Sequence, residues 1–278
     1  MKKYIKLIYV ILVGLIIFCL LAYSFDLAQE EAFFNPWHNS KAYEELKKDA
    51  SFEEVIIEKE NFKLHGWVKP LDKNQKKPLL ICYLGNGQNS SNFLVKSKMP
   101  EYFKDYNLLI VDYPKYGLST GKLIEKDLFE AVLSVYDYGK ELSYVDDSKI
   151  VVFGFSIGTG MATYVASQRE VNGLVLLAPY DNALNLYNDN LNIFYGPIEK
   201  IRKYRFETDK YAEDVKVKPL IVASKSDEVI NYNHSIDLGE KFEDVERFIL
   251  INGEVSHNDI MNSITVYEAV QKYLQERL

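Results

Sequence analysis

Cysteine and histidine are scarce in this chain, and their scarcity excludes several kinds of site. Among 278 residues there are only two cysteines and four histidines. Cys19 lies in an apolar leader and Cys82 in a run typical of a buried strand, so we expect neither a disulfide nor a cysteine-based metal centre. The histidines are scattered, and no His-Glu-x-x-His pair or carboxylate cluster accompanies them. The sequence therefore predicts no bound metal.

Basic residues are also fewer than acidic residues. The chain carries 33 Lys and Arg against 40 Asp and Glu, which gives a formal net charge of −7. A domain this acidic lacks the positive surface that phosphate backbones require. There is no Gly-Lys-Ser/Thr phosphate loop and no dinucleotide-binding glycine fingerprint either. We therefore expect no nucleic-acid partner and no cofactor.

One long apolar run opens the chain. Residues 7–23 hold no charge, and the 17 residues are just enough to cross a bilayer, with residues 4–6 extending the run. Lysines precede the run and acids follow it, which predicts an N-terminus inside and the rest of the chain outside the cytoplasm. We expect residues 1–25 to be a single-pass membrane anchor. The alternative is a signal peptide cleaved near Ala22-Tyr23-Ser24, which would release a secreted protein.

After a polar stretch at 26–50, expected to form a stalk or short helix, residues 51–278 show the pattern of one α/β domain. Continuous apolar strands alternate with helices, which indicates a mostly parallel sheet covered on both faces. The expected strands are 52–59, 62–69, 79–84, 108–112, 149–153, 173–178, 219–223 and 248–251, and the expected helices are 124–142, 157–167 and 260–278. The aromatic-rich insertion 180–217 separates two strands, as lids and binding loops do.

The strongest motif is Gly154-Phe155-Ser156-Ile157-Gly158. An apolar strand runs into it and a helix follows at once. This arrangement, a nucleophile elbow, places a serine on a sharp turn, and the two glycines let strand and helix approach closely. The pattern predicts Ser156 as a nucleophile; the alternative is a merely structural glycine-rich turn.

A serine hydroxyl needs a base to become a useful nucleophile. His257 follows the strand 248–251 in a short loop that could bring an imidazole to Ser156, and it is the favoured base. His234, at a helix start, is the weaker candidate. His38, in the stalk, and His65, within an early strand, are expected to be structural.

The base in turn needs a carboxylate to orient it. Asp227 follows the strand 219–223, at the edge of the sheet where ligand sites of open α/β sheets collect. Glu228 is its nearest rival, and a turn-capping acid is the alternative interpretation. The resulting order along the chain is Ser156, Asp227, His257.

An oxyanion produced by serine attack requires two backbone donors. One is the N–H of Ile157, because it follows the nucleophile at a helix start. The other is expected from the glycine-containing loop 84–90, with Asn86 as the first choice and Gly87 in reserve.

Taken together, these stretches resemble the α/β-hydrolase fold superfamily, in particular small membrane-anchored serine hydrolases of the serine aminopeptidase-like and acyl-hydrolase kind. The matching stretches are Gly66-Trp67, the Gly-Asn-Gly loop at 85–87, the segment 112–121, the elbow at 154–158, and the acid and histidine loops. The resemblance implies the α/β-hydrolase fold, a Ser-Asp-His triad, a non-catalytic segment 112–121 on the site floor, and a small cap at 180–217. One departure is Leu84, where the family usually has histidine.

The leading hypothesis is hydrolysis of an ester or thioester of a small-molecule acyl substrate through an acyl-enzyme at Ser156. A peptidase acting on short peptides is a second possibility, and a non-catalytic hydrolase-like binding protein is a third. The membrane, through the N-terminal helix, is the only other expected partner; no obligate protein partner is evident from the sequence.

Overall fold

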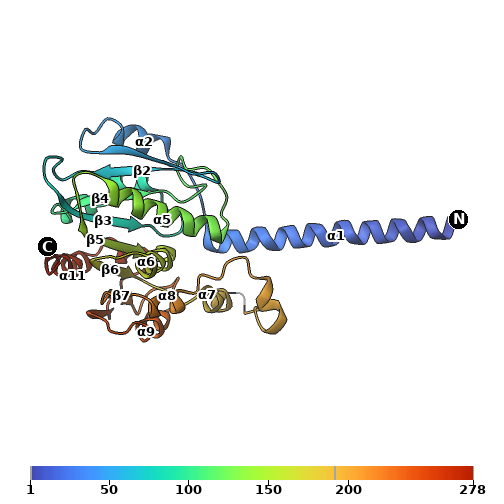
Figure 1. Ribbon diagram of the computed structural model, residues 1–278. Coiled ribbons are helices and arrows are strands. Elements are labelled where there is room, and N and C mark those ends of the chain that lie inside the picture. The colour runs from blue at the N-terminus through green and yellow to red at the C-terminus, as the bar shows by residue number, and fades with distance from the viewer. Residues whose placement is uncertain (1, 191, 278) are drawn as a thin grey trace.

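The computed structural model describes residues 2–190 and 192–277. Its centre is one sheet of eight strands in the order β1-β2-β4-β3-β5-β6-β7-β8 (Figure 1). Only β2 runs against its neighbours β1 and β4; all other strand pairs are parallel. The strands are β1 (Glu53–Glu58), β2 (Lys63–Lys69), β3 (Lys77–Tyr83), β4 (Asn107–Val111), β5 (Val145–Phe155), β6 (Gly173–Leu177), β7 (Leu220–Ser224) and β8 (Arg247–Ile251).

The central strands form because their apolar runs can be buried on both faces. Every residue of β4, β6 and β7 is buried, whereas the edge strand β1 buries only alternate residues. Along β3, Leu79 and Ile81 pack into one core while Leu80 and Cys82 pack into the other. This alternation is the expected consequence of a strand whose neighbouring side chains point to opposite faces.

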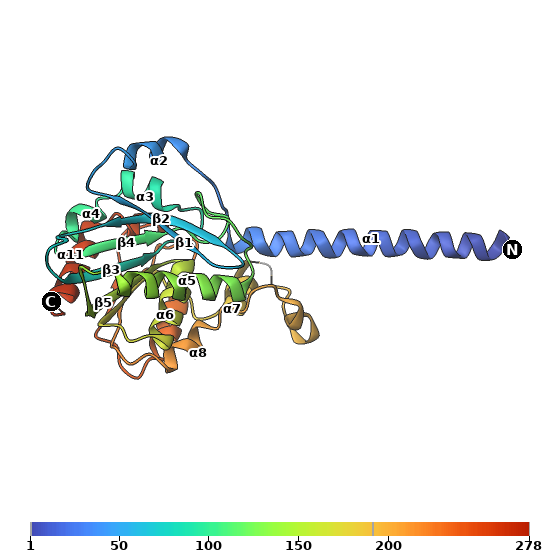
Figure 2. The same cartoon turned by 45° about the horizontal axis from the view of Figure 1, so that its top comes forward.

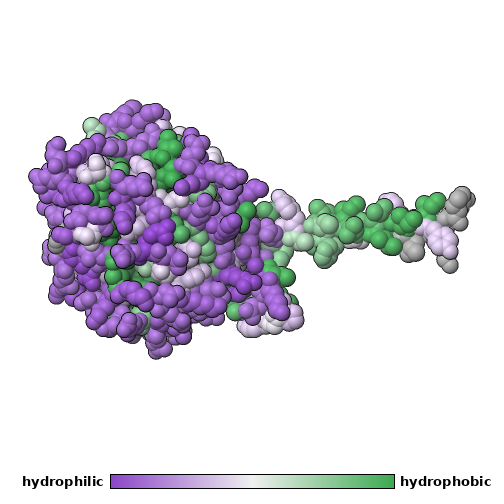
Figure 3. Space-filling view, in the orientation of Figure 1, coloured by the Kyte–Doolittle hydropathy of each residue, from purple (hydrophilic) through white to green (hydrophobic). Residues whose placement is uncertain are grey.

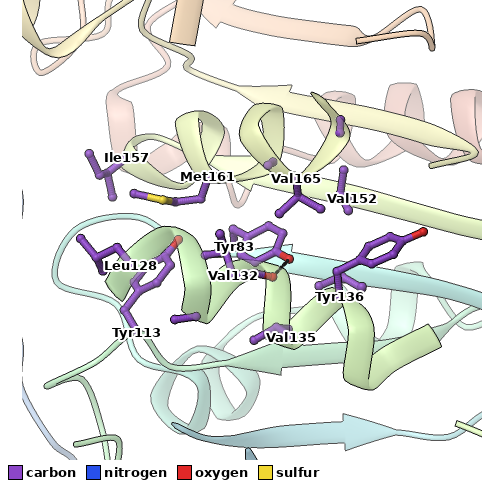
Figure 4. Close-up of a cluster of buried hydrophobic side chains, with 14 of the residues drawn as sticks. Tyr83, Tyr113, Leu128, Val132, Val135, Tyr136, Val152, Ile157, Met161 and Val165 are labelled. Carbon is purple, nitrogen blue, oxygen red and sulfur yellow. Dashed lines mark hydrogen bonds between the residues drawn. The ribbon is translucent and has the colours of Figure 1, made fainter. Parts of the chain in front are cut away.

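Helices cover both faces of the sheet (Figure 2). The core under α5 and α6 includes Leu128, Val132 and Met161, and Tyr83 crosses it to donate a 2.9 Å hydrogen bond to the Val132 carbonyl (Figure 4). The opposite core lies under α3, α4 and α11. The helices are α1 (Lys2–Phe33), α2 (Ser40–Leu46), α3 (Ser90–Lys96), α4 (Met99–Tyr102), α5 (Glu125–Glu141), α6 (Ile157–Gln168), α7 (Ala183–Asn190), η1 (Gly196–Ile201), α8 (Thr208–Glu213), α9 (Tyr232–Gly239), α10 (His257–Ile260) and α11 (Ile264–Gln275).

This architecture confirms the expected mostly parallel sheet with helices on both faces. Each strand expected from the sequence is present within a few residues, and the largest difference is that β5 begins at Val145 rather than Lys149. The expected closing helix 260–278 is two elements, the single turn α10 and then α11, which begins at Ile264.

Helix α1 extends away from the domain and exposes its apolar side chains (Figure 3). Residues 4–33 are long and apolar enough to cross a membrane, although a signal sequence passes the same test of length and composition. The stretch from Tyr4 to Tyr23 alone spans about 30 Å, close to the thickness of a bilayer core.

The helix does not stop where the sequence suggested that a stalk would begin. It continues to Phe33, and both Phe33 and Phe34 are buried in the domain against Tyr204 and Phe206. Lys203 reinforces this contact by pairing with Asp26 and Glu30, each at 2.7 Å. The segment 26–50 is therefore packed on the domain, because its aromatic residues bury apolar surface there.

The insertion 180–217 contains α7, η1 and α8, and its buried side chains, such as Tyr187 and Ala212, belong to the core under α5 and α6. His234, at the start of α9, connects this cap to the body of the domain. Its Nδ1 lies 2.8 Å from Asp181 and its Nε2 lies 2.7 Å from Asp189 of α7. Burial disfavours the imidazolium, but the hydrogen bonds and charges of the two aspartates outweigh burial and raise the pKa of His234 to about 9.

This raised pKa predicts a pH-dependent loss of stability. A histidine whose pKa is higher in the folded state stabilises the fold fully below its unfolded pKa of about 6.5. The stabilisation then declines and is gone above about pH 9. We expect His234→Gln to lower the thermal unfolding midpoint at pH 6, and the gap from the wild type to close by about pH 10. Exposed His38→Gln is the control, and a gap of equal size at every pH would contradict the prediction.

Candidate active site

Ser156 stands between the end of β5 and the start of α6, in a backbone conformation that non-glycine residues seldom adopt. Its φ is 54° and its ψ is −124°. Such strained residues persist only where the surroundings hold them, and they cluster at functional sites. A Cβ on Gly154 would lie 2.5 Å from the Gly158 carbonyl oxygen, and one on Gly158 would lie 2.1 Å from the Tyr83 carbonyl oxygen. The turn therefore requires both glycines of the motif.

The structure brings together the three side chains that the sequence singled out. His257 Nε2 lies 2.9 Å from Ser156 Oγ, and His257 Nδ1 lies 2.7 Å from Asp227 Oδ2. Residues 156 and 257 are 101 positions apart in the chain, so only the fold can place them in contact. Each of the three side chains is almost completely buried. They form one continuous hydrogen-bonded chain.

Backbone groups hold Asp227 in position for this contact. Its Oδ1 accepts hydrogen bonds from the N–H groups of Val229 at 2.9 Å and Ile230 at 2.8 Å, which leaves Oδ2 directed at the imidazole. Glu228, the rival acid, instead accepts the backbone N–H of His257 at 3.0 Å. The two neighbouring carboxylates therefore have separate tasks: Asp227 orients the ring and Glu228 orients the loop that carries it.

The other histidines lie elsewhere. His234 is held between Asp181 and Asp189, as described above, and His65 on β2 contacts Glu54 at 2.8 Å. His38 is exposed between α1 and α2. Of these four residues, only His257 contacts Ser156.

Two sets of backbone N–H groups lie beside Ser156. Ile157 is the first residue of α6, so its N–H has no partner within the helix. A Cβ on Gly85 would lie 3.3 Å from the Ser156 Cβ, which places the loop after β3 against Ser156. The Gly85 N–H is already bonded to the Gln88 side chain at 3.0 Å. Asn86, the next residue, is therefore the better candidate for a donor to an oxyanion.

The segment after β4 supports this loop from beneath. Tyr113 donates to the Leu84 carbonyl at 2.9 Å, and Tyr116 donates to the Asn86 side chain at 3.3 Å. Asp112 accepts hydrogen bonds from the Ser90 backbone and hydroxyl, at the start of α3. Burial raises the pKa of the Asp112 carboxyl to about 7, although the hydrogen bonds from Ser90 oppose this shift. These contacts place the segment 112–121 against the loop 84–90; its non-catalytic role stays a prediction.

Sequence reasoning missed a second support, which comes from the segment after α1. The Trp37 indole N–H donates to the Gly87 carbonyl, and the Trp37 carbonyl accepts the Gly117 N–H at 3.1 Å. The Asn35 N–H donates to Tyr116 Oη at 2.9 Å. No local sequence pattern predicts these contacts, because residues 35–37 are far in sequence from the loop 84–90 and the segment 112–121, which they join.

The part of the chain that the structure describes contains no candidate metal site. Within residues 2–190 and 192–277, no group of three or more His, Cys, Asp or Glu side chains could hold an ion.

The fold defines the class of protein, and a comparison with known sequences gives the same class. The sequence model of the alpha/beta hydrolase fold matches residues 77–226, more than half of the chain. The chain belongs to the α/β-hydrolase fold family.

Three known proteins illustrate the likeness. An uncharacterized protein of Mycobacterium tuberculosis is 23% identical over 226 residues, which cover 80% of this chain and 79% of that protein. Est1E from Butyrivibrio proteoclasticus, solved with ferulic acid bound, has a TM-score of 0.66 at 20% identity, covering 80% of this chain and 98% of that one. An esterase of Pyrococcus furiosus has a TM-score of 0.64 at 17% identity, covering 88% and 99%. At these identities the solved structures show a shared fold.

The close packing at the elbow predicts the effect of one methyl group. We expect Gly158→Ala to destabilise the fold by about 1–3 kcal/mol or more, because the methyl group would overlap the Tyr83 carbonyl. The free energy of unfolding in urea measures this effect. Gly253→Ala is the matched control, since a Cβ at that position has nothing within 4 Å. Equal stability of the two variants would show that the turn can relax around the added atom.

Proposed function

We propose that this chain is a serine hydrolase that cleaves a carboxylic ester or thioester through an acyl-enzyme at Ser156. One observation carries the proposal: the unbroken chain of hydrogen bonds from Asp227 through His257 to Ser156 Oγ. Membership of the α/β-hydrolase fold family supports hydrolase activity. Because the fold alone hosts many chemistries, the geometry of the three side chains is the stronger support.

In the first half of the reaction, Ser156 Oγ attacks the carbonyl carbon while His257 Nε2 takes the hydroxyl proton. Asp227 keeps the proton of the ring on Nδ1 and stabilises the imidazolium that forms. The negative oxygen of the tetrahedral intermediate is held by the N–H groups of Ile157 and Asn86. The intermediate collapses, the alcohol or thiol leaves with the proton from His257, and the acyl group remains on Ser156.

In the second half, a water molecule attacks the acyl carbon and gives its proton to His257. The same two N–H groups hold the second oxyanion. Collapse of this intermediate releases the carboxylic acid and returns the proton to Ser156 Oγ. The two half-reactions use the same imidazole first as base and then as acid, so the position of His257 between Ser156 and Asp227 serves both.

We further propose that α1 is retained as a single-pass anchor with the hydrolase domain outside the cytoplasm. The lysines ahead of the apolar run support this orientation. The helix also runs unbroken through Ala22-Tyr23-Ser24, and its last turns are packed into the domain. Cleavage at that point, with secretion of the domain, is the competing hypothesis. The mass of the mature protein, and whether it is found in the membrane or in the medium, distinguish the two.

Substitution of Ser156 tests the function directly. We expect Ser156→Ala in the full chain to lower kcat/KM for p-nitrophenyl butyrate on the order of 10⁴-fold, because the acyl-enzyme can no longer form. The same variant should lose labelling by a fluorophosphonate probe. Exposed Ser148→Ala is the control and should keep both activities.

Two outcomes would overturn the proposal. Equal labelling of the wild type and Ser156→Ala would place the reactive nucleophile elsewhere. A folded wild type that the probe does not label, and that cleaves no ester, would instead support a hydrolase-like binding protein.

A further inference from the structure

A groove of about 470 Å³ lies beside residues 225–231, the loop after β7 that carries Asp227 and is called here the triad loop, and part of the groove wall belongs to α1. Ala28, Ala32 and Phe33 line it from α1, Leu186 lines it from α7, and Glu228 and Val229 close it from the loop after β7. This volume lies within the range of about 300–1,000 Å³ that is usual for small-molecule sites.

The groove is adjacent to the proposed chemistry. Glu228 and Val229 directly follow Asp227, and each contributes to the triad geometry. The Val229 N–H donates to Asp227, and the Glu228 carboxylate accepts the N–H of His257. A molecule in the groove therefore touches the loop that orients the imidazole.

The wall that α1 contributes is apolar and held in place. Ala28 and Ala32 are one helical turn apart, so their small side chains share one face and leave the groove open. Phe33 packs edge-on against Tyr187 with ring centroids 4.6 Å apart, which fixes this end of the helix against the cap. Most of the groove lining is thus hydrocarbon, which suits a ligand without charge.

The groove also begins close to the expected membrane surface. Ala28 lies five positions after Tyr23, the end of the apolar run, and at a rise of 1.5 Å per residue this is about 8 Å along α1. A chain-like ligand could therefore lie in the groove while its far end stays in the bilayer.

A second apolar surface lies on the same side of the domain as α1. The segment from 193 to 201, which includes η1, projects beside α1 in both views of the molecule (Figures 1 and 2). Ile193, Tyr195, Ile198 and Ile201 are between 43% and 58% exposed. Four exposed apolar side chains within nine residues favour an interaction surface, and beside the proposed membrane anchor they suit the interface of a bilayer.

We propose that the groove binds the long acyl chain of an ester or thioester that resides in the membrane, and that the chain enters from the bilayer between α1 and the 193–201 segment. This inference rests on the proposed function, because it assigns the substrate class of the same site. The acyl chain lies along Ala28 and Ala32, and its carbonyl reaches Ser156.

Filling the groove tests the proposal. In full-length protein reconstituted in phosphatidylcholine vesicles, we expect Ala32→Phe to lower kcat/KM for p-nitrophenyl palmitate at least tenfold. Its kcat/KM for p-nitrophenyl butyrate should stay within twofold of the wild type, since a short chain needs little of the groove. Ala28→Phe, on the same wall, should act alike. Ala22→Phe, on the exposed part of α1, is the matched control and should change neither rate.

Unchanged preference for palmitate over butyrate in both groove variants would overturn the proposal, as would an equal loss in Ala22→Phe. The retained butyrate rate reports that the groove variants are folded. The source of the chain has its own test: Ile198→Asp with Ile201→Asp should slow palmitate hydrolysis in vesicles but leave butyrate hydrolysis unchanged. An unchanged rate of palmitate hydrolysis would show that the acyl chain does not enter beside this segment.

A binding measurement separates this proposal from the proposed function. We expect the Ser156→Ala variant, which cannot turn over, to bind an uncharged fluorescent long-chain fatty alcohol, and Ser156→Ala with Ala32→Phe to bind it at least tenfold more weakly. Binding with no hydrolysis in the wild type would sustain the groove and reject the hydrolase. Hydrolysis of esters with no binding of the fatty alcohol would sustain the hydrolase and reject the groove.

Discussion

The contact between the first turn of α6 and the end of β3 is the constraint on which the rest of the site depends. Gly158 approaches the Tyr83 carbonyl so closely that no side chain fits between them. This approach forces the chain to reverse at Ser156, where φ becomes positive and the hydroxyl is left at the edge of the sheet. The same approach places the start of α6 beside the loop after β3. One packing contact therefore brings together Ser156 and both candidate oxyanion donors.

The sheet then determines where the other two side chains lie. Asp227 follows β7 and His257 follows β8, and these strands run parallel to β5, so all three chain ends meet at one edge. Parallel strands separated by crossover helices collect functional residues in this way. This explains how three residues spread over 102 positions come to form one hydrogen-bonded chain, and why small loop contacts such as that of Glu228 with the His257 backbone are enough to align it.

The parts of the molecule that could be predicted from the sequence are those that a local sequence pattern indicates. The buried strands are continuous apolar runs, and the elbow shows its serine between glycines at the strand-to-helix turn. Asp227 and His257 follow such strands directly. The packing of Phe33 and the hydrogen bond from Trp37 to Gly87 could not be predicted, because each joins segments far apart in the chain and neither has a repeating pattern. The polar composition of residues 26–50 indicated a stalk, whereas its aromatic residues Phe33, Phe34 and Trp37 hold the segment against the domain.

These unpredicted contacts change how the apolar helix α1 relates to the site. The loop that carries Asn86 is supported from one side by Tyr113 and Tyr116 and from another by Asn35 and Trp37. Residues 35 and 37 follow α1 directly, and α1 itself lines the groove beside the triad loop. Because a helix is stiff over a few turns, the position of its apolar part is coupled to both the oxyanion loop and the groove. Helix α1 and the domain are in this sense one unit, since the end of α1 lines the groove and the residues that follow it support the loop that carries Asn86.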